Sequence, residues 1–300
     1  MSFLSGGPPD MSDPATKARQ GLRFLGVVPF FAYAALFLLA PTAFLVIGAF
    51  QNQEGGFTLD NLFNLANPTI VAAYWISIKV SAASAIGGAV IGLLIAQAAV
   101  NGGLPGWIRP TLFTFSGVAS NFAGIPLAFA FLATLGRTGL VTALLKSWFG
   151  VNLYASGFNL LGFWGLTLTY LYFQIPLMVL IISPALEGLR REWREAAATL
   201  GAGDIEYWRR IALPILWPSV LGATLLLFAN AFGAIATAYA LTGSSLNIVT
   251  ILLYAQIRGD VLHDKNLGYA LALGMIFITG LSNVLYIWLR GRGERWLRRS

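Results

Sequence analysis

Long runs of hydrophobic residues without any charge divide the chain into alternating apolar and polar stretches. The first run, Gly26–Phe50, covers 25 residues. That length is enough for a helix to cross a hydrocarbon core of about 30 Å. The runs Val80–Val100, Pro110–Gly136 and Asn266–Leu289 are of similar length. Each of these four runs predicts a membrane-spanning helix.

Two further runs are too long for one straight span each. Ser147–Leu186 begins with polar residues that suit an interface, so its expected crossing is Asn159–Ser183. The second of these long runs divides into a span, Ile215–Leu241, and a shorter segment, Leu246–Ile257. That segment is too short to cross the membrane and is either re-entrant or interfacial. The pattern therefore predicts an all-α integral membrane protein with six transmembrane helices.

The distribution of basic residues predicts the orientation of these helices. With both termini inside, 14 of the 19 Lys and Arg residues fall in inner segments, as the positive-inside rule requires. Residues 1–25 and 290–300 are then cytoplasmic tails around a transmembrane domain over 26–289, and the loop at 185–214 is cytoplasmic. The inner basic residues are Lys17, Arg19, Arg23, Arg109, Arg190, Arg191, Arg194, Arg209, Arg210, Arg290, Arg292, Arg295, Arg298 and Arg299.

The composition agrees with a membrane protein. Hydrophobic residues make up 57% of the chain and charged residues 10%, whereas soluble domains contain about 25% charged residues. The net charge of +7 comes from basic residues beside apolar spans, so we expect no nucleic-acid partner. The chain has no cysteine and a single histidine, His263, so we expect no metal site.

The loop at 185–214 has the densest cluster of charged residues between the spans. Ten of the protein's charged residues fall between positions 187 and 210. Glu187, Arg190, Arg191, Arg194 and Glu195 are three or four residues apart, a spacing that predicts a first short helix with a charged face.

A turn and a second helix are expected to follow. Gly201 and Gly203 permit a sharp turn, because glycine enters positive φ without steric cost. Asp204 is suited to cap the second helix, and Leu213-Pro214 to end it where the fifth span begins. The loop therefore predicts a helix–turn–helix platform on the cytoplasmic face. The apolar stripe of its second helix is Ile205, Trp208, Ile211 and Ala212.

This loop resembles the EAA motif of binding-protein-dependent ABC importer permeases. Glu195-Ala196-Ala197 is followed after three residues by Gly201, after nine more by Ile211, and after one more by Leu213-Pro214, which is the full spacing of that motif. With its six spans the chain resembles the type I importer permease fold. The short tail and short first outer loop are most similar to the spermidine/putrescine-type permeases.

The resemblance implies a set of partners and roles. In that family the loop contains coupling helices that insert into a cleft on an ATPase subunit. By this resemblance Glu195 would contact the ATPase, and Ala196 and Ala197 would pack against it. Gly201 would form the turn between the two helices. A complete transporter has two permease subunits, identical or homologous. It also has two ATPase subunits, which hold ATP and Mg²⁺, and usually an extracytoplasmic substrate-binding protein. The implied location is the bacterial plasma (inner) membrane. The implied function is inward passage of a small polar solute, such as a polyamine, by alternating access.

Motifs that are absent narrow the alternatives. The chain contains no G-x-x-x-x-G-K-[ST] loop, so we expect neither ATPase activity nor a bound cofactor in this subunit. An ion-coupled secondary transporter would need buried ionisable residues, whereas all 12 acidic residues lie outside the predicted spans. A non-transporting membrane scaffold would have no need of the platform.

Several polar residues within the spans are candidates for a solute path. The alternative for each of them is a hydrogen bond between helices, which such residues commonly supply. In the second span the G-x-x-x-G pair of Gly88 and Gly92 predicts close helix packing. The path candidates are Asn121, Tyr170, Gln174 and Asn230.

The outer segments offer weaker signals. Gly139–Trp148 is amphipathic and is expected to lie along the outer interface. By family analogy the outer loops receive the binding protein, with Asp260, Asp264 and Lys265 as candidate contacts, although a solvated loop is an equal alternative.

Overall fold

The computed structural model describes residues 27–258 and 264–297; the tail expected over 1–25, Asp260 and His263 lie outside the described residues. Across the described part, the chain is helical apart from its connections and one isolated antiparallel bridge between Gln51 and Phe57. Six of the described segments are long and apolar enough to cross a membrane, which confirms the expected number. They are Val27–Ala49, Pro68–Asn101, Ile125–Phe149, Phe163–Glu187, Asp204–Phe232 and Lys265–Leu289.

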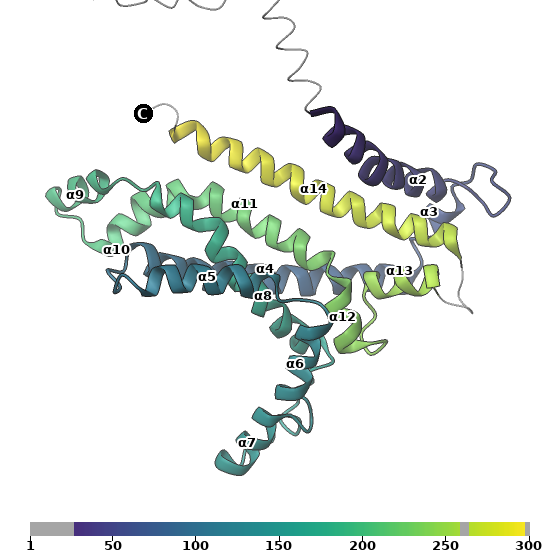
Figure 1. The fold of residues 1–300 in the computed structure, drawn as a ribbon, viewed down its shortest axis with the longest axis horizontal. Coiled ribbons are helices and arrows are strands. Elements are labelled where there is room, and N and C mark those ends of the chain that lie inside the picture. Colours follow the sequence, from purple (N-terminus) through teal and green to yellow (C-terminus); the bar gives the residue numbers. More distant parts are fainter. Residues whose placement is uncertain (1–26, 259–263, 298–300) are drawn as a thin grey trace, which may run out of the picture.

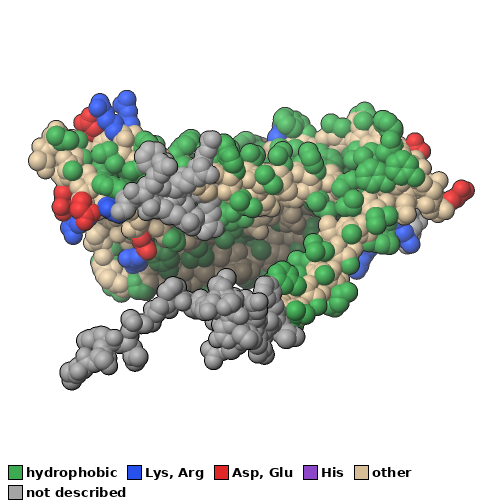
Figure 2. Space-filling model, turned by 90° about the horizontal axis from the view of Figure 1, so that it is seen from above, with side chains coloured by type: hydrophobic (Ala, Val, Ile, Leu, Met, Phe, Trp, Pro, Cys, Tyr) green, Lys and Arg blue, Asp and Glu red, His purple; other side chains and the backbone are tan. Residues whose placement is uncertain are grey.

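The long helices run side by side as one elongated bundle (Figure 1). Two short helices, α9 (Arg191–Thr199) and α10 (Asp204–Tyr207), lie at one end of the bundle. Helices α3 (Asp60–Asn64) and α13 (Val249–Arg258) lie at the other end. Charged side chains gather at these two ends, while hydrophobic side chains cover much of the surface between them (Figure 2). The main helices of the bundle are α2 (Ala40–Ala49), α4 (Pro68–Asn101), α5 (Ile108–Asn121), α8 (Phe163–Glu187), α11 (Leu213–Phe232) and α14 (Lys265–Leu297).

Glycines allow α4 to pack closely against α8, as the G-x-x-x-G pair predicts. A Cβ added at Gly92 would lie 2.6 Å from the Cβ of Met178 and 2.8 Å from the carbonyl oxygen of Ile175. A Cβ at Gly88 would lie 2.7 Å from the Cβ of Gln174. Contact this close is possible only where one helix lacks side chains, and it brings the two backbones together.

The second and sixth helices are longer than the charge-free runs predict. Helix α4 begins at Pro68, where the side chain of Asn67 accepts a hydrogen bond of 3.0 Å from the Thr69 amide. Lys79 therefore lies within the helix, with its ammonium 5.0 Å from the centre of the Trp75 ring. Helix α14 continues to Leu297, beyond the apolar span that ends at Leu289, so residues 290–297 of the expected tail are helical.

The predicted third span, 110–136, is broken into two helices. Helix α5 ends at Asn121 and α6 (Ile125–Leu135) begins after a short break, in which Gly124 has a φ of +76°. The break was missed because the whole run is apolar. Together, α6 and α7 (Leu140–Phe149) form an arm that projects from the bundle (Figure 1). Helix α7 thus continues the arm. The segment Ile125–Phe149, which contains both α6 and α7, is long and apolar enough to cross a membrane.

The predicted fifth span, 215–241, is also broken. Helix α11 ends at Phe232, and α12 (Ile235–Thr242) follows after Gly233 and Ala234. The segment predicted to be re-entrant or interfacial contains α13 (Val249–Arg258), which packs on α14 and α4. The buried Val249 amide donates a hydrogen bond of 2.9 Å to the Ser77 hydroxyl of α4. Both spans are therefore discontinuous, which is typical of transport proteins with a central path.

Candidate coupling platform and solute path

The loop at 185–214 folds into a compact platform on the bundle. Helix α9 (Arg191–Thr199) leads through a turn to α10 (Asp204–Tyr207), and a π-helical turn, η2 (Trp208–Ala212), then continues into α11. The platform has its own small apolar core. Its buried residues are Ala197, Tyr207 and Ala212, and the half-buried ones around them are Leu189, Trp193, Ala202, Trp208 and Ile211.

Gly201 makes the turn between the two helices in the way its position predicts. Its φ is +81°, in the left-handed region. Its amide donates a hydrogen bond of 2.9 Å to the Ala198 carbonyl, and the next amide, of Ala202, donates one of 3.0 Å to the Ala197 carbonyl. These two bonds form a Schellman motif, which closes a helix with a glycine in just this conformation.

Two predicted roles of acidic residues in the platform are wrong. The residue that precedes α10 is Gly203, and Asp204 makes no cap; its carboxylate instead accepts a hydrogen bond of 2.8 Å from the guanidinium of Arg194. This ion pair joins α9 to α10 across the turn. Glu187 was predicted on the first platform helix, but it is the last residue of α8, because the chain leaves the helix at Gly188.

The end of the second platform helix also differs from the prediction. The chain stays helical through Leu213-Pro214, since a π-helical turn directly precedes the proline. Proline has no amide to donate and crowds the carbonyl four residues earlier, and a local widening of the helix relieves that conflict. The platform therefore connects to the fifth span without a break.

Exposed apolar side chains mark the outer surface of the platform. Leu200 is 88% exposed, and Ile205, a member of the predicted apolar stripe, is 86% exposed. Ile205 borders a shallow groove of about 380 Å³. Large apolar residues that protrude among charged ones are typical of a surface that binds a partner. The groove is lined by Asp204, Ile205, Trp208, Arg209 and Leu213.

The motif residues divide between the surface and the interior of the platform. Glu195, Ala196 and Gly201 are exposed, as a contact surface requires. Ala197 is only 4% exposed and packs within the platform core, which corrects the expectation that it packs on a partner. Ile211 is half-buried against the same core, while Leu213 and Pro214 are exposed.

The four path candidates also divide into two kinds. Tyr170 is buried and its hydroxyl donates a hydrogen bond of 2.6 Å to the Ala234 carbonyl. Gln174 is fully buried, and its amide nitrogen donates one of 2.9 Å to the Leu227 carbonyl. These two side chains therefore join α8 to the fifth span, although the buried Oε1 of Gln174 has no hydrogen-bond partner among the described residues. Asn121 and Asn230 are exposed.

The breaks in the third and fifth spans lie next to each other. The Gly124 amide donates a hydrogen bond of 2.7 Å to the hydroxyl of Thr237 in α12. The exposed residues Asn121 and Asn230 are each within a few positions of a break. The arrangement therefore brings two broken helices and two exposed amide side chains to one region of the bundle. Sequence reasoning missed the breaks, whose signals were Gly124, Gly233 and the proline at the start of α6, Pro126.

A domain comparison identifies the family. Residues 88–299 match the family described as the binding-protein-dependent transport system inner membrane component. The match covers both halves of the platform and most of the spans. The chain belongs to this family.

Curated members similar to this chain transport different solutes, according to their names. A probable sulfate transport system permease of Chlorella vulgaris is 25% identical over 74% of this chain and 81% of its own. The molybdenum transport system permease ModB of Escherichia coli is 30% identical over 54% and 67%. The spermidine/putrescine permease PotC of Haemophilus influenzae is 30% identical over 40% and 45%.

Solved structures agree on the fold. A bacterial ABC transporter that imports the acidic polysaccharide alginate contains a chain that matches 94% of this one and 98% of its own length, with a TM-score of 0.69 at 17% identity. The fold of this family member is therefore that of a type I ABC importer permease, as the platform motif predicted. The structural match at this identity concerns the fold alone.

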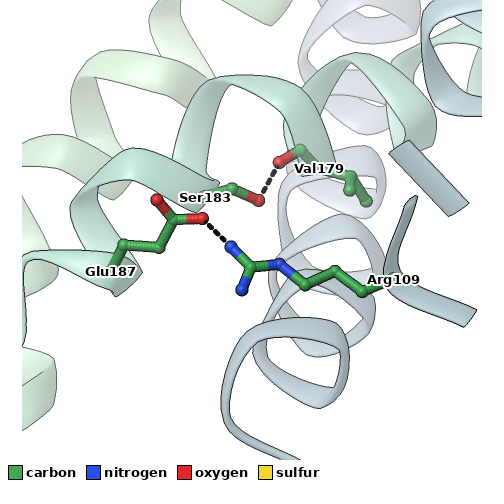
Figure 3. A network of polar contacts seen from close by, with 4 residues as sticks. All are labelled: Arg109, Val179, Ser183 and Glu187. Atoms are coloured by element: carbon green, nitrogen blue, oxygen red, sulfur yellow. Dashed lines mark hydrogen bonds and ion pairs between the residues drawn. The ribbon is translucent and has the colours of Figure 1, made fainter. Parts of the chain in front are cut away.

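One ion pair between two of the spans was not predicted from the sequence. The guanidinium of Arg109, at the start of α5, forms an ion pair with the carboxylate of Glu187, the last residue of α8 (Figure 3). One turn earlier in α8, the Ser183 hydroxyl donates to the Val179 carbonyl and so stays within its own helix. The available signal was that both charges lie at predicted inner ends of spans. Among the described residues, no cluster of His, Cys, Asp and Glu is suited to a metal ion.

Proposed function

We propose that this chain forms the solute path of an ATP-driven importer and receives its driving force through the platform. The observation that carries the proposal is the platform itself, in which the EAA spacing coincides with a Schellman turn at Gly201 and with protruding apolar side chains. A surface of this kind, on the side where basic residues gather, suits a soluble ATPase subunit. ATP and Mg²⁺ are held by that subunit, because this chain has no phosphate-binding loop.

The other partners follow from the same proposal. A second permease subunit, identical or homologous, completes the path, and a substrate-binding protein delivers the solute at the end of the bundle that carries α3 and α13. Asp264 is committed to capping α14, since its carboxylate accepts hydrogen bonds of 3.1 Å from the amides of Asn266 and Leu267. Lys265 is then the better candidate for docking. The assembly resides in a bacterial inner membrane with both termini of this chain in the cytoplasm.

An ion-coupled mechanism is less well supported. The carboxylates in the six apolar segments are Glu187, Asp204 and Glu206. All three lie at the ends of segments that adjoin the platform, and each forms an ion pair with an arginine. A proton- or sodium-coupled transporter needs ionisable groups deeper in the membrane. The platform would also serve no purpose in such a transporter or in a scaffold.

We propose that the solute is small and polar, and that it passes between the broken third and fifth spans beside Asn121 and Asn230. The short first outer loop favours a polyamine. Apart from the ion-paired carboxylates at their platform ends, the described spans contain no carboxylate. This favours an anion, because a polycation would cross without an opposite charge, and we take the anion as the stronger candidate. A thermal-shift screen of the cognate binding protein is expected to show stabilisation by an oxyanion. Stabilisation by spermidine or putrescine alone would contradict this preference.

Glu195→Lys is expected to weaken binding of the ATPase subunit by about tenfold or more. Glu195 is exposed on α9 and its ion pair with Arg191 is long, at 3.8 Å, so the variant does not disturb the platform core. Reversal of a charge at an interface replaces attraction with repulsion and costs a few kcal/mol when the charge becomes desolvated. Copurification of the ATPase with the detergent-solubilised permease measures the effect.

The matched control is Glu54→Lys, which makes the same charge change at the opposite end of the bundle, on the exposed turn next to the Gln51–Phe57 bridge. It should leave ATPase binding unchanged. Undiminished binding by Glu195→Lys would exclude this residue from the interface.

A further inference from the structure

The ion pair between Arg109 and Glu187 connects two spans at the end of the bundle that carries the platform. Arg109 lies in the first turn of α5, and its guanidinium also lies 5.8 Å from the centre of the Phe113 ring. Glu187 closes α8, and helices α5 and α8 pack against each other. Both charged side chains are about half-exposed, 48% and 45%, so the pair is accessible to water and adds little stability by itself. The pair therefore matters through its position, since it joins the start of α5 to the end of α8.

The platform is fixed to the same last turn of α8. The Gly188 amide donates a hydrogen bond of 3.1 Å to the Pro184 carbonyl, and the Leu189 amide donates one of 3.2 Å to the Leu186 carbonyl. The Leu189 side chain packs both against the bundle core around α8 and against the platform core. The platform is therefore joined to the end of α8 both by backbone hydrogen bonds and by packed side chains.

Helix α5 leads from Arg109 directly to the break in the third span. It ends at Asn121, and the Gly124 amide beyond the break donates a hydrogen bond to Thr237 of the fifth span. The chain of contacts runs from the platform through Leu189 and Glu187 to Arg109 and on to the two breaks. Packed side chains and hydrogen-bonded elements that follow one another in this way can carry coupling between distant sites.

We propose that Arg109 is a positioning residue that transmits movement of the docked ATPase from the end of α8 to the broken third span. The inference rests on the proposed function. Loss of the pair would allow the platform to move with the ATPase while α5 stays behind. ATP hydrolysis would then continue with less solute transported for each ATP consumed.

The test is the amount of solute transported per ATP hydrolysed, in proteoliposomes that contain the full complex and its loaded binding protein. Arg109→Glu and Glu187→Arg should each lower this ratio about fivefold, the scale on which one half-exposed ion pair acts. The double variant Arg109→Glu/Glu187→Arg restores the pair with reversed charges and should return the ratio to within about twofold of wild type. Arg109→Lys, which keeps the charge, should also stay within about twofold.

Thr111→Ala is the matched control. Thr111 is exposed, and its hydroxyl donates to the Trp107 carbonyl one turn back along the chain rather than to a group of α8, so the ratio should not change. Insertion and ATPase binding are measured first, and Arg109→Gln replaces any reversed-charge variant that fails to insert. A wild-type ratio in the single variants, or no recovery in the double variant, would overturn the inference. Absence of ATP-driven uptake by the wild-type complex would instead refute the proposed function.

Discussion

Gly201→Val is expected to reduce transport by roughly tenfold or more while the spans still insert and fold. The φ of Gly201 is +81°, and a β-branched residue in that region is strained by about 1–3 kcal/mol. A Cβ at this position meets nothing within 4 Å, so the strain comes from the backbone alone. The variant must either distort the Schellman turn or destabilise the platform. In both cases the surface that carries Leu200 and Ile205 loses its geometry.

The chain supplies a close control for this variant. Gly203 is two residues further on, is equally exposed, and also has nothing within 4 Å of an added Cβ, but its φ is −75° and its ψ is 169°. Any residue adopts that extended conformation, so Gly203→Val should transport normally. ATP-driven uptake by membrane vesicles measures both variants. Equal uptake would show that the left-handed turn is not required for coupling.

Gly92→Val is expected to prevent the permease from folding stably, so that little protein survives detergent extraction. An added Cβ would lie 2.6 Å from Met178 and 2.8 Å from the backbone oxygen of Ile175 in α8. A side chain can shift, but the carbonyl belongs to the helix, so the whole α4–α8 contact would have to separate. Overpacking of this kind costs about 1–3 kcal/mol at sites that relax, and more at sites that do not.

Gly280→Val in α14 is the control for helix propensity and added volume. Gly280 is also inside a spanning helix, but a Cβ there has nothing within 4 Å. The control should extract and remain monodisperse in size-exclusion chromatography, where Gly92→Val should aggregate. Equal behaviour of the two variants would mean that the close approach of α4 and α8 is not needed for folding.

The number of spans was predictable because lipid imposes a length and a composition on every helix that crosses it. The ends of the helices were less predictable. Lys79 interrupts the charge-free run, so the second span was started too late, although the capping residue Asn67 and Pro68 mark the true start. A long side chain at a helix surface can carry a charge without ending the helix.

The breaks at Gly124 and Gly233 were hidden for a different reason. The residues around them are as apolar as the helices they separate, and hydropathy does not distinguish a continuous span from two shorter helices. A tertiary contact stabilises the first break: the Gly124 amide donates a hydrogen bond to Thr237, 113 positions away. A single sequence contains no local signal for such a contact.

The platform was largely predictable because its chemistry is local. The glycine at position 201 predicted a left-handed turn, which is confirmed. Asp204 was misassigned because the same residue type serves as a helix cap and as an ion-pair partner, and the position of Arg194 across the turn decides between the two. Ala197 could not be assigned to the interior from its sequence, because small residues suit both a docking surface and a tight core.

The most direct test of the account is uptake by the reconstituted complex. The permease, its ATPase subunit and the second permease subunit are placed in proteoliposomes with the loaded binding protein outside and ATP and Mg²⁺ inside, and accumulation of the labelled solute is measured against time. The account predicts accumulation that requires ATP and the binding protein, persists when proton and sodium gradients are collapsed by ionophores, and fails when the permease carries Glu195→Lys. Uptake that proceeds without ATP and stops when the gradients are collapsed would contradict it.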